Sequence, residues 1–131
     1  MIVLDTCAIL WDALSPSLLS KKAATAITHA DAGNSIIISD ISLWEIAMLI
    51  RKGRLEIDVS AARFLQIFLQ SRNVVVKAIT PEIAELSVNL GAEVGNDPAD
   101  RIIAATAMLN NASLVTADQR LIDCTLVDTL W

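Results

Sequence analysis

The stretch Asn96–Ala107, Asn-Asp-Pro-Ala-Asp-Arg-Ile-Ile-Ala-Ala-Thr-Ala, combines a turn, a helix start and an apolar helix. Asp97 suits the N-cap, where a carboxylate accepts hydrogen bonds from free N–H groups, and Pro98 suits the first helical position. Capping alone explains Asp97, Pro98 and Asp100 without any catalysis. Asp100 nevertheless precedes residues that are apolar on most sides, which predicts a helix packed against a sheet. We therefore expect Asp100 to face a crevice rather than bulk water.

Three further acidic residues lie in apolar surroundings: Asp5, Glu45 and Asp118. Asp5 follows the apolar run 1–4, which is typical of a buried strand, and Asp118 follows a second such run at 112–116. Each has a structural alternative, because Asp5 can cap a short helix and Asp118 can be a plain turn residue.

Glu45 lies in the middle of a helix predicted over 41–52, which is apolar nearly all round and so is expected to be largely buried. A buried carboxylate must be paired, protonated or bound to a metal. A salt bridge to Arg51 or Arg54 is the structural alternative for Glu45.

Strands and helices alternate along the whole chain. We predict strands at 1–4, 35–39, 74–79, 112–116 and 125–127, and helices at about 7–11, 16–30, 41–52, 60–72, 80–90 and 98–109. Such alternation indicates an α/β fold, a three-layer α/β/α sandwich around a mainly parallel sheet of four to five strands. The length of 131 residues fits one domain, 1–131.

Ligands of such sheets bind beyond the carboxyl ends of the strands, where the strand order reverses. Asp5 ends the first strand, Asp118 follows the fourth, and Asp100 begins the helix that leads into the fourth. These three acids meet if the first and fourth strands are neighbours, and Glu45 can reach the same crevice. Because four carboxylates in one crevice repel each other and divalent cations prefer oxygen ligands, we expect a metal site.

The composition limits the class of protein. The content of 54% hydrophobic residues predicts a well-filled core and some apolar surface for a partner, and no apolar run approaches the length of a membrane span. Cys7 and Cys124 lack metal-ligand spacing, which favours a reduced, cytosolic protein.

The net charge of −5 argues at first against a nucleic-acid partner, since phosphate binding usually requires a basic surface. Without the four candidate site acids the net charge becomes −1, so the acidity belongs to the site. Basic side chains at Arg51, Lys52, Arg54 and Arg101 are candidates for contacts to a phosphate backbone.

Four segments carry a family resemblance. They are Leu4-Asp5-Thr6, Ser42–Ile46 with Lys52–Leu55, Asp97–Arg101 and Val115–Asp118. In this order and spacing they resemble the PIN-domain family, particularly the VapC-like toxin nucleases of bacterial and archaeal toxin–antitoxin pairs.

The resemblance implies a metal-dependent endoribonuclease. By it, Asp5, Glu45, Asp100 and Asp118 would bind Mg²⁺ or Mn²⁺ and hydrolyse RNA. Thr6 and Thr116 would be supporting hydroxyls. It also implies a homodimer that binds a small protein antitoxin.

Other functions compete with this interpretation. A PIN-like domain that has lost catalysis could serve as an interaction module. A phospho-acceptor receiver domain shares the alternating pattern, but its late lysine is missing, since Lys77 is the last lysine. Phosphatases of the haloacid dehalogenase type need a second aspartate two residues after the first, where this chain has Cys7.

Overall fold

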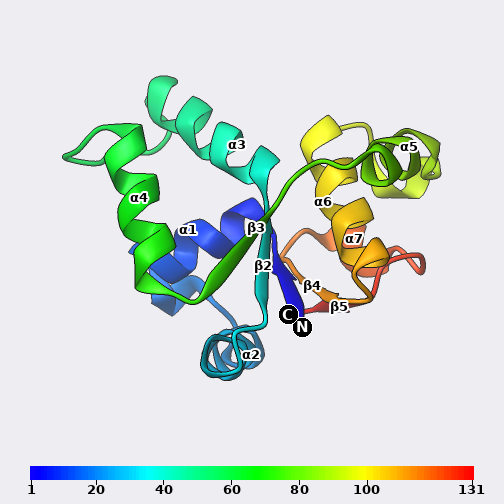
Figure 1. Cartoon of the computed structure of the whole chain (residues 1–131), viewed down its shortest axis with the longest axis horizontal. Coiled ribbons are helices and arrows are strands. Elements are labelled where there is room, and N and C mark those ends of the chain that lie inside the picture. The colour runs from blue at the N-terminus through cyan, green and yellow to red at the C-terminus, as the bar shows by residue number, and fades with distance from the viewer.

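A five-stranded parallel sheet forms the centre of the computed structural model, which describes residues 1–131 (Figure 1). The strands lie in the order β3-β2-β1-β4-β5. Their bounds are β1 Ile2–Leu4, β2 Ile36–Ser39, β3 Val74–Lys77, β4 Ser113–Val115 and β5 Thr129–Leu130.

The central strand β1 pairs with β2 on one side and with β4 on the other. Leu4 lies opposite Val115 in the β1–β4 register. The chain builds outward from β1 to β3 and then returns to the other side of β1, so the strand order reverses between β1 and β4. The first and fourth strands are therefore neighbours, which was the condition for Asp5, Asp100 and Asp118 to meet. Ligands of parallel sheets commonly bind beyond the strand ends at such a point.

Helices cover both faces of the sheet. They are α1 Thr6–Leu14, α2 Lys21–Ala32, α3 Asp40–Arg51, α4 Ala61–Ser71, α5 Pro81–Asn89, α6 Pro98–Leu109 and α7 Gln119–Asp123, with 3₁₀ turns at Pro16–Leu18 and Ala92–Val94. α1, α2, α3 and α4 lie on one side of the sheet and α5, α6 and α7 on the other (Figure 1). The predicted three-layer sandwich is confirmed.

Side chains alternate along the strands and divide the core in two. Val3, Ile37 and Leu114 face α5, α6 and α7, where they pack with Ile103. Their neighbours in sequence, including Leu4 and Val115, face the other helical layer. Successive residues of a strand point to opposite faces, so one buried strand serves both cores.

No helix combines the length and the apolar character that a membrane span needs.

One helix and one strand begin at other residues than the sequence predicted. The helix expected at 16–30 is split, because the Ser20 hydroxyl accepts from Ala23 N at 3.0 Å and starts α2 at Lys21. The last strand lies at Thr129–Leu130 and not at 125–127, because Val127 is buried in the core beside α7 instead of pairing.

Two expectations about extent and burial were also wrong. β3 ends at Lys77 and forms an edge of the sheet, with most of its residues exposed. The helix α3 is not largely buried: only Ser42 and Ile46 are fully enclosed, and the Trp44 side chain is 60% exposed. An apolar sequence cannot show which face of a helix the neighbouring elements cover.

Arg101 ties the start of α6 to the end of α5. Its Nε donates to Ser87 O at 2.8 Å, its Nη1 donates to Gly95 O at 2.7 Å, and its Nη2 donates to Leu90 O. The last carbonyls of a helix lack partners within the helix, and the guanidinium fork supplies several donors at once. The guanidinium is thus occupied by carbonyl groups of the protein, and a contact of Arg101 with a phosphate backbone stays a prediction.

Arg101→Ala should lower the free energy of unfolding by about 2–3 kcal/mol, because it leaves several carbonyls without a charged donor. Urea denaturation followed by circular dichroism measures this loss. Arg63→Ala, on an exposed position of α4, is the matched control and should change stability by less than about 0.5 kcal/mol. Equal stability of the two variants would show that the Arg101 contacts contribute nothing.

Candidate metal centre

Asp5 lies buried between the end of β1 and the start of α1. Its Oδ1 accepts from Thr6 N at 2.8 Å, so the predicted cap is present. Its Oδ2 accepts from the Thr116 hydroxyl at 2.7 Å. Both carboxylate oxygens of Asp5 are therefore held in place by hydrogen bonds. Asp5 caps α1 and also lines a cavity at the end of the sheet.

Thr116 joins Asp5 to Asp118. The fully buried Thr116 hydroxyl, which donates to Asp5, also accepts from Asp118 N at 3.0 Å. Asp118 in turn caps α7, because its Oδ1 accepts from Arg120 N at 2.9 Å. The pairing of β1 with β4 and this single hydroxyl thus fix the relative positions of two carboxylates that are far apart in sequence.

Glu45 is held by hydroxyls and not by a basic side chain. The Thr6 hydroxyl donates to Glu45 Oε1 and lies 3.1 Å from Ser42 Oγ. The two salt bridges of the protein both belong to Arg72, so the expected alternative of an ion pair at Glu45 is wrong. Ser42 was not predicted as a site residue; its place one helical turn before Glu45 was the available signal.

Asp97, and not Asp100, caps α6. Asp97 Oδ1 accepts from Ala99 N at 2.9 Å and from Asp100 N at 3.4 Å. Pro98 takes the first helical position as predicted. Since the cap is already provided, the Asp100 side chain is free to face the cavity between α6 and α1.

These segments enclose one cavity of about 410 Å³ at the carboxyl edge of the sheet. All four candidate acids line it, together with Thr6, Cys7, Leu10, Trp11, Leu49 and Ala117. We call it the acidic cavity. The structure therefore brings Asp5, Glu45, Asp100 and Asp118 together from four separate segments, with Thr116 bonded to Asp5 behind them.

The electrostatics of the acidic cavity favour protonated carboxyl groups. Burial, followed by the charges of Asp5, Asp97, Glu45 and Asp118, raises the pKa of Asp100 to about 7. Burial also raises the pKa of Asp5, against the hydrogen bonds from Thr116 and Thr6, and it raises the pKa of Glu45. The neighbouring charges that act on these three groups are all negative. Like charges without a counter-charge make the ionised cavity unfavourable.

The donor set fits a hard divalent cation, because carboxylate and hydroxyl oxygens are the ligands that Mg²⁺ and Mn²⁺ take. The side chains stand apart: no three of the acidic, histidine or cysteine side chains converge closely enough to enclose an ion. Cys7 is no soft ligand here, since burial and Asp5 raise the pKa of its thiol to about 12.

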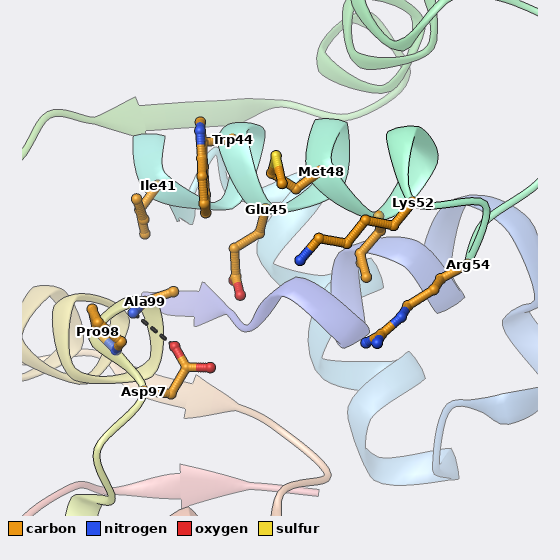
Figure 2. A pocket seen from close by; sticks show the side chains of 10 residues that line it. Ile41, Trp44, Glu45, Met48, Lys52, Arg54, Asp97, Pro98 and Ala99 are labelled. Atoms are coloured by element: carbon orange, nitrogen blue, oxygen red, sulfur yellow. Dashed lines mark hydrogen bonds between the residues drawn. The ribbon is translucent and has the colours of Figure 1, made fainter.

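A second cavity, of about 730 Å³, adjoins the first between α3 and the start of α6 (Figure 2). Glu45 and Leu49 line both cavities. Lys52 and Arg54, two of the candidate phosphate contacts, line the second cavity. Arg51 is exposed and lines neither cavity, and Arg101 is occupied at the end of α5.

A family model for the PIN domain matches residues 2–125 of this chain. The chain belongs to the PIN domain family. This match excludes the receiver-domain and dehalogenase-type alternatives. It is consistent with the parallel sheet.

One similar protein aligns with this chain over most of its length. The chain is 35% identical over 120 residues to "Ribonuclease VapC22" of Mycobacterium tuberculosis, covering 92% of this chain and 88% of that protein.

Among solved structures, VapBC2 from Rickettsia felis bound to a promoter DNA fragment matches with a TM-score of 0.74 and 20% identity, over 98% of this chain and 97% of that one. A toxin–antitoxin complex from Klebsiella pneumoniae matches with a TM-score of 0.64 and 21% identity, over 98% and 99%. FitAB bound to a DNA fragment matches with a TM-score of 0.66 and 18% identity, over 98% and 93%. At these identities the structures support the fold of the PIN domain.

Asp100→Asn should stabilise the metal-free PIN domain, and more so as the pH rises. The folded-state pKa of Asp100, about 7, lies above its ordinary value of 3.8. The contribution of Asp100 to folding stability is therefore fully present below pH 3.8 and is lost as the pH rises towards 7. We expect the free energies of unfolding of the variant and the wild type to differ little at about pH 5. At about pH 8 the variant should be more stable by about 1–2 kcal/mol, after allowance for solvent screening.

Thermal unfolding in EDTA at the two pH values measures this effect. Glu56→Gln, at an exposed position of the loop after α3, controls for the loss of one negative charge. A stability difference that stays constant across this range would contradict the described environment of Asp100.

Proposed function

We propose that this PIN domain is a metal-dependent endoribonuclease that hydrolyses RNA phosphodiester bonds as the toxin of a toxin–antitoxin pair. The observation that carries the proposal is the acidic cavity: four carboxylates from separate segments meet at the carboxyl edge of a parallel sheet, and no basic side chain pairs with them. The 35% identical relative, which is named a ribonuclease, supports the same substrate class.

Asp5, Glu45, Asp100 and Asp118 would hold Mg²⁺ or Mn²⁺. A bound ion of this kind lowers the pKa of water and stabilises charge on the phosphate oxygens. The protein's own contribution is positioning. Thr116 fixes Asp5 relative to Asp118, and Thr6 fixes Glu45 relative to Asp5. Hydroxyls that hold ligands in this way act as the outer shell on which metal affinity depends.

The acidic cavity offers no histidine to activate a nucleophile, and the Thr6 hydroxyl in its lining donates its hydrogen to Glu45. The chain's single histidine, His29, is exposed near the end of α2, and the Cys7 thiol stays protonated because burial raises its pKa. Hydrolysis by an activated water therefore fits the side chains that are present, and Lys52 and Arg54 stand beside the cavity to meet a phosphate backbone.

We further propose a protein antitoxin as the partner, and a homodimer as the assembly. Two of the similar structures are of VapBC2 and of a toxin–antitoxin complex. Large apolar side chains that remain exposed, such as Val88 and Leu109, provide surface for such contacts.

Purified protein should cleave a structured RNA mixture in Mg²⁺ or Mn²⁺, and EDTA should abolish the cleavage. Asp5→Asn and Asp100→Asn should each reduce the rate by more than about 100-fold, because a metal site contributes several kcal/mol to the transition state. Glu56→Gln, at an exposed acid outside the cavity, should leave the rate unchanged.

Gel electrophoresis of the RNA measures the cleavage rate, and circular dichroism verifies that each variant is folded. Folded wild-type protein that neither cleaves RNA nor binds either ion would reject the nuclease and favour an interaction module.

A further inference from the structure

An exposed tryptophan stands beside the acidic cavity. The Trp44 side chain is 60% exposed and, with Ile41 and Met48 of α3 and Pro98 of α6, lines the cavity of about 730 Å³ (Figure 2). We call this space the Trp44 cavity. Its volume lies within the range of ligand sites, roughly 300–1,000 Å³. A large flat apolar side chain left open to water in such a cavity indicates a binding surface.

Two cations border the same space. Gly53 ends α3 with a backbone angle φ of 71°. Gly53 N donates to Ile50 O at 3.1 Å, and Arg54 N donates to Leu49 O at 3.0 Å. This glycine-dependent turn folds the chain back over the last turn of the helix. Lys52, the C-cap of α3, and Arg54, which follows the turn, both line the Trp44 cavity, and neither belongs to a salt bridge.

The Trp44 cavity adjoins the acidic cavity. Glu45 and Leu49 line both spaces, and Figure 2 shows the Glu45 and Lys52 side chains extending from α3 into the same region. A chain molecule with one phosphate at the carboxylates would therefore place its next unit beside Trp44 and the two cations.

We propose that the Trp44 cavity binds the nucleotide next to the cleaved phosphate of a single-stranded RNA, with its base stacked on the Trp44 indole and its backbone against Lys52 and Arg54. This assignment rests on the proposed nuclease function. Unpaired bases stack on aromatic side chains, and a phosphate backbone requires cations nearby. Two carboxylates also line the Trp44 cavity: Glu45, which it shares with the acidic cavity, and Asp97, whose Oδ1 accepts from Ala99 N and Asp100 N. The flat apolar wall matches a base, and Lys52 and Arg54, which form no salt bridge, match the phosphate backbone.

Binding of RNA to the uncleaving Asp100→Asn protein tests the proposal. The probe is a fluorescein-labelled, 12-nucleotide RNA of mixed sequence in Mg²⁺, followed by anisotropy. Adding Trp44→Ala should weaken binding by about 10-fold, whereas Trp44→Phe, which can still stack, should stay within about 3-fold. Ile67→Ala, at an exposed apolar position of α4 away from both cavities, is the matched control and should have no effect.

Salt dependence separates stacking from charge. Lys52→Gln and Arg54→Gln should each reduce the slope of log affinity against log salt by about 0.7, the value for one phosphate contact to a single strand. Trp44→Ala should weaken binding without changing that slope. Lys21→Gln, at an exposed position of α2, is the control for charge.

The outcomes distinguish this proposal from the function on which it rests. If Asp100→Asn binds RNA and none of the Trp44, Lys52 and Arg54 variants differs from it, the nucleotide site is wrong while the nuclease stands. The same conclusion follows if Trp44→Phe binds as weakly as Trp44→Ala. If folded wild-type protein neither binds nor cleaves RNA, both proposals fail.

Discussion

The parallel pairing of β1 with β4 is the constraint on which the site depends. It places the end of β1 beside the end of β4, so that the Thr116 hydroxyl reaches Asp5 and receives the Asp118 N–H. A shift of one residue in this register would turn Val115 and Thr116 each to the face opposite its present one and separate the two carboxylates. The core enforces the register, since Val3 and Leu114 must pack on one face and Leu4 and Val115 on the other.

The acidic cavity is unfavourable to the protein alone. Burial and mutual repulsion raise the pKa values of Asp5, Glu45 and Asp100, and the hydroxyls of Thr6 and Thr116 only partly offset this for Asp5 and Glu45. Fixed carboxylates without a counter-charge store unfavourable electrostatic energy that a cation would relieve. The scaffold thus holds four carboxyl groups where a divalent ion would stabilise their ionised forms, which is the physical basis of the proposed function.

Much of this arrangement follows from the sequence, because it depends on local rules. Apolar runs that end in Asp5 and Asp118 mark the strand ends, and Asp97-Pro98 marks the start of α6. Contacts between distant segments do not follow in the same way. The Ser42–Thr6 contact spans 36 residues, and the carbonyl partners of Arg101 lie up to 14 residues before it. The exposure of Trp44 depends on what packs against α3, and no periodicity in the helix itself records that.

Calorimetric titration with Mn²⁺ tests most directly whether the four carboxylates form one cation site. At about pH 6.5, in two buffers of different ionisation enthalpy, we expect saturable binding with net release of protons, because the Asp100 pKa of about 7 leaves that group partly protonated before the ion arrives. Asp100→Asn should bind more weakly and release fewer protons. Absence of binding, or binding with no proton release, would show that the four carboxylates do not form one cation site.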